Sequence, residues 1–98
     1  MKVRYTATAR RELSEAVDYL LEHAPAVAGD FAMSIEAAVA ELLRNPYSAQ
    51  QTEQRGVRRK YIRRFRYGIF YMVDESADEL IVRNIRHAAR RWPWEDAR

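Results

Sequence analysis

The segment from residue 55 to residue 66, RGVRRKYIRRFR, carries seven cations and no carboxylate, interleaved with aromatic and branched apolar side chains. Guanidinium groups bind phosphate and carboxylate oxygens through paired hydrogen bonds, and neighbouring aromatic rings can stack on nucleobases. The segment therefore indicates a surface for a negatively charged partner. A purely structural interpretation stands beside it, because charge protects edge strands against unwanted pairing and arginine stems cover apolar surface.

A second group of residues that could do chemistry lies in the last predicted strand and just beyond it. Arg83, Arg86 and His87 belong to this strand, and Arg90 and Arg91 follow it. Imidazole can act as a general acid or base near neutral pH, although a histidine at a strand end is equally a structural residue. Two histidines and no cysteine argue against a metal site. With no glycine-rich phosphate loop either, we expect no cofactor.

Length and charge distribution narrow the class of protein. The chain has 98 residues, which suits one domain over residues 1–98. Residues 1–54 carry five cations and eight anions, net −3, whereas residues 55–98 carry twelve cations and six anions, net +6. A basic half attracts nucleic acid, a membrane surface or an acidic protein. Because the sequence contains no apolar secretion signal and no apolar run near the roughly 20 residues that span a bilayer, we expect a cytoplasmic protein without a membrane partner.

The hydrophobic pattern predicts the elements that must position these residues. It predicts a strand within residues 1–6, a helix hairpin over residues 7–45, a three-stranded antiparallel region over residues 57–87 and a tail over residues 88–98. The last three strands are expected at Val57–Phe65, Tyr67–Asp74 and Leu80–His87. The order β-α-α-β-β-β predicts an α+β fold, in which the N-terminal helix hairpin packs on one face of an antiparallel sheet.

The predicted strand Val57–Phe65 has no cleanly apolar side. Alternation places Arg59, Tyr61, Arg63 and Phe65 on one side, and Arg58, Lys60, Ile62 and Arg64 on the other. Some of these cations must therefore be exposed. Trp92 and Trp94 are expected to fold back onto the body of the protein. On the first helix, the charged residues, Glu12 among them, are expected mostly on faces away from the apolar stripe.

Several short motifs, taken together, resemble one known family. They are A-x-x-E-L at Ala9–Leu13 followed by Tyr19-Leu20, NPYS at Asn45–Ser48, GVRR at Gly56–Arg59, RRFRYGIFYMV at Arg63–Val73 and IRHAARR at Ile85–Arg91. In this order they resemble the RelE/ParE toxins of bacterial type II toxin–antitoxin modules, from about residue 4 to about residue 91. Together, in this order, the motifs are fairly specific to the family. The β-α-α-β-β-β order is also the arrangement of that family.

The resemblance implies a toxin that a cognate antitoxin holds inactive in a toxin–antitoxin hetero-oligomer. In this family the C-terminal segment of the antitoxin wraps the toxin with a helix and often with an added strand. The segment is usually acidic, which would complement a basic sheet. The residues expected to bind it here are Leu13, Val17 and Leu20 on the first helix, and Arg58 and Lys60 on the basic strand.

The family divides by mechanism, and this chain resembles the ParE branch more closely. ParE-like members inhibit DNA gyrase by contact, without catalysis. RelE-like members use several lysines and a tyrosine or histidine near the C-terminus, but here Lys60 is the only lysine beyond Lys2, and no tyrosine follows Tyr71. The residues expected to contact the target are Arg63, Arg64, Arg83, Arg86, His87, Arg90 and Arg91.

Two alternatives remain open from the sequence. The first is a RelE-like endonuclease that acts on the ribosome and cleaves mRNA without a metal. In that case His87 would move the proton, while Arg63, Lys60 and Arg83 would hold the scissile phosphate. The second alternative is a module without toxicity that binds nucleic acid or a protein partner. Whether the chain is an enzyme is therefore left open by the sequence.

Overall fold

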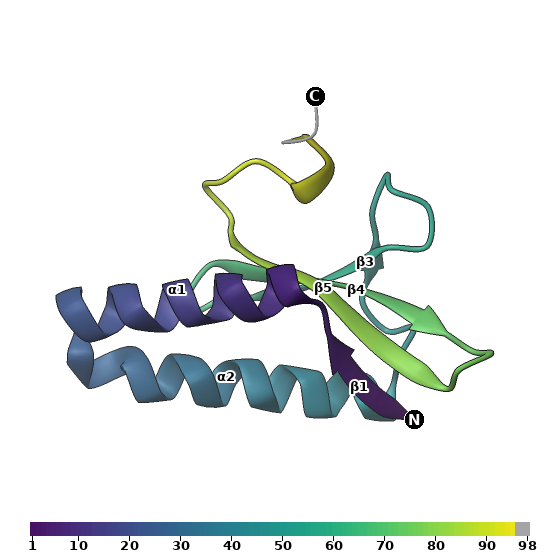
Figure 1. Ribbon diagram of the computed structural model, residues 1–98, viewed down its shortest axis with the longest axis horizontal. Coiled ribbons are helices and arrows are strands. Elements are labelled where there is room, and N and C mark those ends of the chain that lie inside the picture. The colour runs from purple at the N-terminus through teal and green to yellow at the C-terminus, as the bar shows by residue number, and fades with distance from the viewer. Residues whose placement is uncertain (96–98) are drawn as a thin grey trace.

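The computed structural model describes residues 1–95, which form two helices and one five-stranded sheet (Figure 1). The helices are α1 (Ala7–His23) and α2 (Pro25–Arg44). The strands are β1 (Lys2–Tyr5), β2 (Gln50–Gln51), β3 (Arg58–Ile62), β4 (Tyr67–Asp74) and β5 (Glu79–His87). The predicted α+β fold with a helix hairpin on a sheet is confirmed. A short 3-10 helix, Pro93–Glu95, closes the described chain, and residues 96–98 of the predicted tail lie outside it.

Local signals in the sequence account for both helices. The Thr6 hydroxyl accepts the Ala9 N–H at 3.1 Å and so satisfies a free donor at the start of α1. Pro25 opens α2 at a first-turn position, where no N–H is needed. Phe31, Ile35 and Leu42 recur at helical spacing and are buried in the core. Because only Ala24 separates the two helices, they form an antiparallel hairpin.

The sheet is mixed, so the prediction of a wholly antiparallel sheet is wrong for the first strand. The strand order is β1-β5-β4-β3-β2, and β1 runs parallel to β5, from the pair Lys2 and Glu79 to the pair Tyr5 and Val82. Short connections impose antiparallel pairing only on consecutive strands, and β1 is separated from β5 by most of the chain. The two-residue strand β2, which pairs with Arg58 and Arg59, was not predicted.

The basic strand is shorter than predicted. β3 ends at Ile62, and residues 63–66 form the turn into β4, in which Arg66 has a left-handed φ of 59°. Strict alternation would have placed Phe65 on the same side as Arg59, away from the helices. The turn instead lets the Phe65 ring meet the Phe31 ring edge-on, with centroids 5.2 Å apart. The predicted strand alternation therefore does not apply to Arg63, Arg64 and Phe65.

The two faces of the sheet are covered differently. Ile69 and Tyr71 of β4 are buried in the core shared with the helices. Phe70, between them, points to the opposite face and contacts the tail, with its ring centroid 5.5 Å from that of Trp92 and 5.8 Å from that of Trp94. The prediction that the tryptophans fold back onto the body is therefore confirmed. Figure 1 shows the tail on the side of the sheet opposite α2.

The ionisation of Tyr71 links stability to alkaline pH. Its ring is fully buried, and its hydroxyl donates to the Pro46 carbonyl at 2.7 Å. Burial raises the pKa of Tyr71 above its ordinary value of 10.0. The pKa of Tyr71 is therefore higher in the folded state than in the unfolded state. The stability that the neutral Tyr71 hydroxyl contributes is complete below pH 10, and it is lost as pH rises through the folded-state pKa.

We expect Tyr71→Phe to lower the Tm at pH 7 and to weaken its pH dependence. The variant loses a buried hydrogen bond worth about 1 kcal/mol, but it also loses the ionising group. Thermal unfolding followed by circular dichroism should show a smaller fall in Tm from about pH 9 to about pH 11 than in the wild type. Tyr61→Phe, which changes an exposed ring, is the control. Equal falls in wild type and Tyr71→Phe would contradict the prediction.

Candidate functional site

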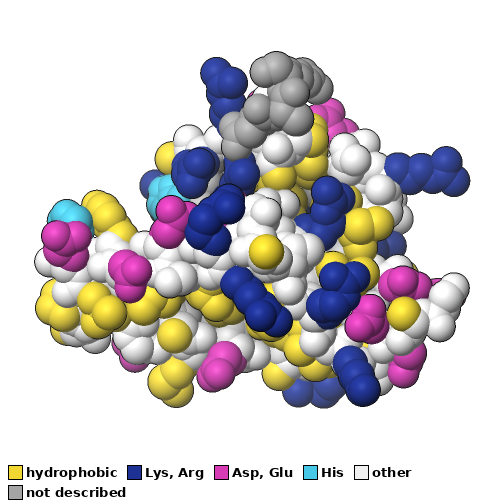
Figure 2. Space-filling model, in the orientation of Figure 1, with side chains coloured by type: hydrophobic (Ala, Val, Ile, Leu, Met, Phe, Trp, Pro, Cys, Tyr) yellow, Lys and Arg dark blue, Asp and Glu magenta, His cyan; other side chains and the backbone are white. Residues whose placement is uncertain are grey.

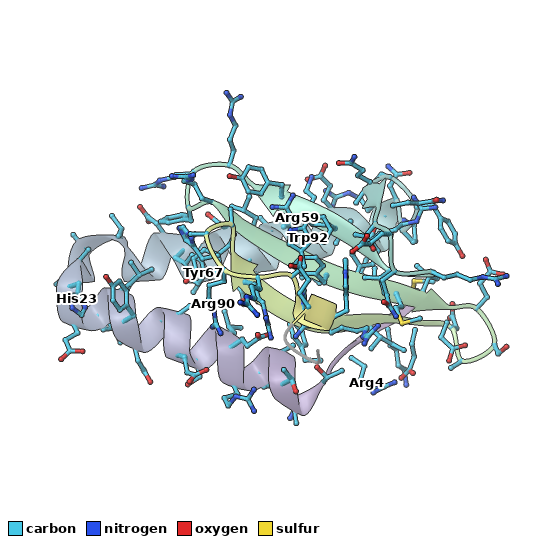
Figure 3. The ribbon with its side chains drawn as sticks, turned by 90° about the horizontal axis from the view of Figure 1, so that it is seen from above. Arg4, His23, Arg59, Tyr67, Arg90 and Trp92 are labelled. Atoms are coloured by element: carbon cyan, nitrogen blue, oxygen red, sulfur yellow. The ribbon has the colours of Figure 1, made fainter. Side chains whose placement is uncertain are left out.

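A cluster of one arginine and aromatic rings occupies the face of the sheet opposite the helices. We call it the far-face cluster, and its members are Arg59, Tyr61, Phe70, Trp92 and Trp94. The Arg59 guanidinium carbon lies 4.7 Å from the Tyr61 ring centroid, 5.4 Å from that of Trp92 and 5.9 Å from that of Phe70. Such cation–π contacts hold a guanidinium without an ion pair. Figure 3 shows Arg59 and Trp92 side by side over the sheet.

Gly68 allows Arg59 to lie flat on the sheet. A Cβ atom on Gly68 would come within 2.7 Å of Arg59 Nε. Arg59 belonged to the basic stretch, but sequence reasoning did not include it among the site residues. The available signal was Gly68 itself, because a glycine inside a strand often marks a close approach of another group. The partner could not be identified from the sequence, since the contact joins two strands.

The tail is tied to the body at several points. The Ala88 N–H donates to the Arg66 carbonyl at 2.7 Å, and Trp94 Nε1 donates to Glu53 Oε1 at 2.6 Å. Between these ties the side chains of Arg90 and Arg91 are exposed. Figure 2 shows basic side chains gathered over the sheet and tail, whereas apolar and acidic side chains dominate the far end of the helix hairpin.

A small hollow of about 230 Å³ lies between α1 and the end of β5. Its lining includes Glu15 and Tyr19 from α1, and Tyr67, His87 and Arg90 from the sheet and tail. Burial raises the pKa of Tyr67, and the nearby positive charge of Arg90 opposes this rise. Sequence reasoning quoted Tyr67 in a motif but gave it no role. Its place beside the tail depends on the pairing of β4 with β5, which brings Tyr67 opposite His87.

His87 is held in one orientation by the tail. Its Nδ1 accepts the Ala89 N–H at 3.0 Å, and its ring stands edge-on to the Tyr67 ring, with centroids 5.2 Å apart. Because Nδ1 is the acceptor, the neutral ring carries its proton on Nε2. In this arrangement Nε2 can donate a hydrogen bond, while the Nδ1 lone pair is engaged by the Ala89 N–H.

The structure does not bring the four catalytic candidates together. Lys60 Nζ lies 3.5 Å from Glu41 Oε1, on the helix side of the sheet. Arg83 Nη1 lies 3.8 Å from Met72 Sδ, and Arg63 is exposed in the turn between β3 and β4. Within the described chain, no hydrogen bond joins His87 to any of these three cations. Residues 1–95 also contain no group of three or more His, Cys, Asp or Glu side chains that could hold a metal ion.

The residues predicted to bind a target fall into three groups. His87, Arg90 and Arg91 lie together at the end of β5 and in the tail. Arg63 and Arg64 lie in the turn that the Ala88–Arg66 hydrogen bond joins to the tail, and Arg64 Nη2 is 3.1 Å from Asp30 Oδ2. Arg83 and Arg86 are partly covered, and Arg86 is paired with Glu12. Glu12 was expected on a solvent face of the helix, but it is buried.

The residues predicted to bind an antitoxin do not form one patch. Leu13, Val17 and Leu20 are half-buried against the core. Arg58 and Lys60 point to the helix side of the sheet, and Arg58 Nη1 donates to the carbonyls of Tyr47, at 3.0 Å, and Ala49, at 2.8 Å. The large apolar side chains exposed on the helix hairpin are instead Tyr19, Leu21 and Met33. No helix in residues 1–95 combines the length and the apolar character that a membrane span requires.

Comparisons with known proteins agree with this architecture. Three of the solved structures that share the fold show the extent of the similarity to this chain. A chain of the chromosomal ParDE TA system from P. aeruginosa superposes with a TM-score of 0.76 at 21% identity, covering 89% of this chain and 95% of that one. The isolated E. coli RelE toxin gives 0.65 at 14% identity, covering 98% and 93%. The toxin–antitoxin complex RelBE2 from Mycobacterium tuberculosis gives 0.58 at 26% identity, covering 88% and 95%.

Sequence comparison identifies the family. No curated protein sequence matches the chain. A family model does match, over residues 3–92, and it describes the ParE toxin of the type II toxin–antitoxin system parDE. This match covers nearly the same range as the motifs that resembled RelE/ParE toxins. The chain therefore belongs to the ParE toxin family of type II toxin–antitoxin systems.

Proposed function

We propose that this toxin inhibits DNA gyrase by direct contact rather than by catalysis. The observation that carries the proposal is the separation of the catalytic candidates: Lys60 is paired with Glu41 on the helix side, whereas His87 lies at the end of β5 with its Nδ1 engaged by the Ala89 N–H. A metal-free nuclease needs a base and cations that converge on one phosphate. A contact inhibitor needs only an exposed surface of complementary charge, and membership in the ParE family supports the same interpretation.

The proposed target surface consists of the end of β5, the tail loop and the adjoining turn between β3 and β4. Arg90 and Arg91 are exposed in the tail loop, and Arg63 is exposed in the turn. The hydrogen bond from the Ala88 N–H to the Arg66 carbonyl holds these two segments together. Exposed cations steer an acidic partner and set the register in which it binds. We therefore expect an acidic patch on the target.

We further propose that a cognate antitoxin neutralises the toxin in a hetero-oligomer. The helix hairpin exposes Tyr19, Leu21 and Met33, with exposed fractions of 59%, 55% and 66%. Large apolar side chains exposed at this level suit the apolar face of a partner helix. The exposed edges of Leu13 and Val17 would extend the same contact. One of the structures that share the fold is itself a toxin–antitoxin complex.

The first test is to measure new DNA and new protein by pulse-labelling, minutes after this chain alone is induced in bacteria. We expect DNA synthesis to fall before protein synthesis, with a DNA-damage response. His87→Ala should keep most of the toxicity, because the proposed surface uses exposed arginines and not imidazole chemistry. Purified toxin should inhibit supercoiling by gyrase, and this inhibition should disappear when the antitoxin is added.

Other outcomes would overturn the proposal. If protein synthesis collapses first and His87→Ala abolishes the arrest, the toxin is a ribosome-dependent endonuclease. If growth and both syntheses continue normally while purified chain binds random DNA in a salt-dependent way, the chain is a nucleic-acid-binding module without toxicity. In either case the exposed arginines of the tail, Arg90 and Arg91, would have a role other than contact with gyrase.

A further inference from the structure

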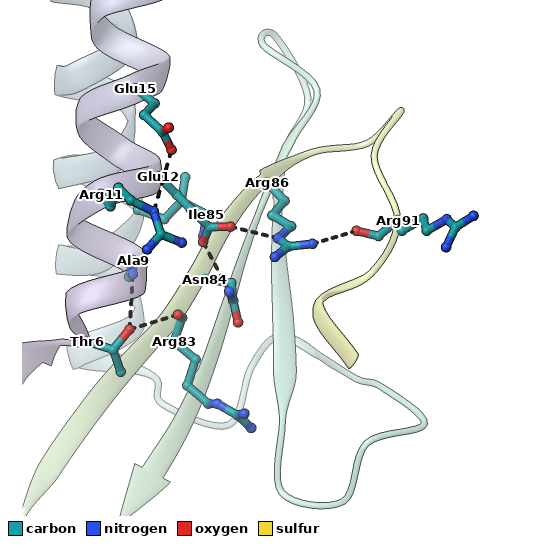
Figure 4. A network of polar contacts seen from close by, with 10 residues as sticks. All are labelled: Thr6, Ala9, Arg11, Glu12, Glu15, Arg83, Asn84, Ile85, Arg86 and Arg91. Atoms are coloured by element: carbon teal, nitrogen blue, oxygen red, sulfur yellow. Dashed lines mark hydrogen bonds and ion pairs between the residues drawn. The ribbon is translucent and has the colours of Figure 1, made fainter. Parts of the chain in front are cut away.

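Glu12 is a buried carboxylate that joins α1 to the last strand (Figure 4). Its Oε1 accepts hydrogen bonds from Asn84 Nδ2, at 3.1 Å, and from the Ile85 N–H, at 3.0 Å. Its Oε2 accepts one from Arg86 Nε at 2.7 Å. Because β1 pairs with β5 only as far as Val82, Glu12 satisfies a backbone donor at the edge that β1 leaves open.

Arg86 extends this connection from the last strand to the tail. While its Nε donates to Glu12, its Nη1 donates to the Arg91 carbonyl at 3.2 Å. A guanidinium is planar and rigid, so the direction of the Nε–H bond also fixes the direction of the Nη1 donor. The orientation that the Glu12 carboxylate imposes on Arg86 therefore determines where the Arg91 carbonyl is held.

The middle of the tail loop depends on this contact. Ala88, at the start of the loop, bonds to the body through Arg66, whereas the N–H groups of Ala89 and Arg90 bond back to His87. These last two bonds hold the start of the loop against the end of β5, and Trp92 packs on Phe70 just after Arg91, so the Arg86 contact holds the backbone between these two anchors. In Figure 4 the Arg91 side chain points away from the body while its carbonyl faces Arg86. A change in the Arg86 orientation would therefore redirect the exposed side chain.

We propose that Glu12 is a positioning residue for the tail: acting through Arg86, it fixes the direction in which Arg90 and Arg91 leave the surface. The effect on toxicity rests on the proposed function, in which these arginines contact the target. The effect on the position of the tail does not rest on it. A structural role for Glu12 would lower stability without changing the tail of the folded protein.

The test is the variant Glu12→Gln in the full-length chain. Both tryptophans of the chain lie in the tail, at positions 92 and 94, so acrylamide quenching of tryptophan fluorescence reports the tail directly. We expect the quenching constant of the folded variant to rise about twofold, because a local opening exposes the rings. The inducer level needed for growth arrest should rise about tenfold. Binding of the antitoxin to the exposed side chains Tyr19, Leu21 and Met33 should change by less than about threefold, because the Glu12 carboxylate is buried and faces β5.

Glu41→Gln is the matched control, because it makes the same chemical change in an exposed ion pair, that of Glu41 with Lys60. It should leave quenching and toxicity as in the wild type. If Glu12→Gln fails to fold, Arg86→Lys carries the test, because it keeps a cation opposite Glu12 but lacks the planar pair of donors that joins Glu12 to the Arg91 carbonyl. Unchanged quenching in folded Arg86→Lys would overturn the positioning role.

Two results separate this inference from the proposed function. Unchanged quenching in a folded variant would overturn the positioning role of Glu12, whatever happened to toxicity. Increased quenching with full toxicity would support the positioning role and would overturn the tail as the target surface.

Discussion

Reversing the charge of both Arg90 and Arg91, as Arg90→Glu/Arg91→Glu, is expected to abolish growth arrest. Both side chains are exposed in the tail loop, on the surface proposed to meet an acidic target. Placing like charges against each other at an interface costs several kcal/mol, so affinity should fall by more than about a hundredfold. The measurements are colony formation after induction and inhibition of gyrase supercoiling by the purified variant.

The matched control is Arg10→Glu/Arg11→Glu, which changes the net charge equally at exposed positions of α1. It should remain toxic, because the general charge of the protein is not what binds the target. Antitoxin binding by the tail variant shows that it is folded. A folded Arg90→Glu/Arg91→Glu chain that still arrests growth would exclude the tail as the target surface.

The parts of the fold set by local patterns could be predicted from the sequence. Both helices and β4 follow from periodicity and from local boundary signals such as Thr6 and Pro25, which act within a few residues. The apolar run Tyr67–Asp74 is typical of a central strand covered on both faces, and β4 lies between β5 and β3 in the sheet. These features depend on residues that are close together in the sequence, so one sequence is enough to predict them.

The parts set by distant contacts could not be predicted. Helical periodicity places Glu12 away from the apolar stripe of α1, yet its carboxylate is buried against the edge of β5 that β1 leaves open beyond Val82. The basic strand ends at Ile62, and the turn after it brings the Phe65 ring against that of Phe31 in α2. Each case depends on a contact across more than thirty residues.

The candidate site was predicted in composition but not in geometry. The basic half and the arginines around His87 were evident, yet alternation alone could not show that Lys60 faces α2 while Arg59 faces the tail. Side-chain direction in a strand has only two values, and the sequence does not say which one faces the helices when both sides carry cations. The tail's contact with Phe70 resolves this ambiguity, and it is a tertiary contact.

Phe31→Ala is expected to destabilise the protein by about 3–5 kcal/mol, the usual cost of truncating a buried aromatic ring. Phe31 is fully buried, and its ring contacts those of Phe65 and Tyr67, with centroids 5.2 Å and 4.9 Å away. Removing the ring leaves a cavity between α2, the turn after β3 and the start of β4. In urea unfolding, the midpoint concentration should fall, while the slope of the free energy of unfolding against urea concentration should change little.

Met33→Ala is the control for this prediction, because Met33 is 66% exposed and lies two residues further along the same helix. It should change the free energy of unfolding by less than about 0.5 kcal/mol. The comparison also bears on function, since the turn next to Phe31 carries the Arg66 carbonyl that holds the tail through Ala88. If Phe31 supports the turn, the variant should lose toxicity even where it remains mostly folded. If Phe31→Ala lowers the free energy of unfolding by less than about 1 kcal/mol, the surrounding rings close the cavity. The turn would then not depend on α2.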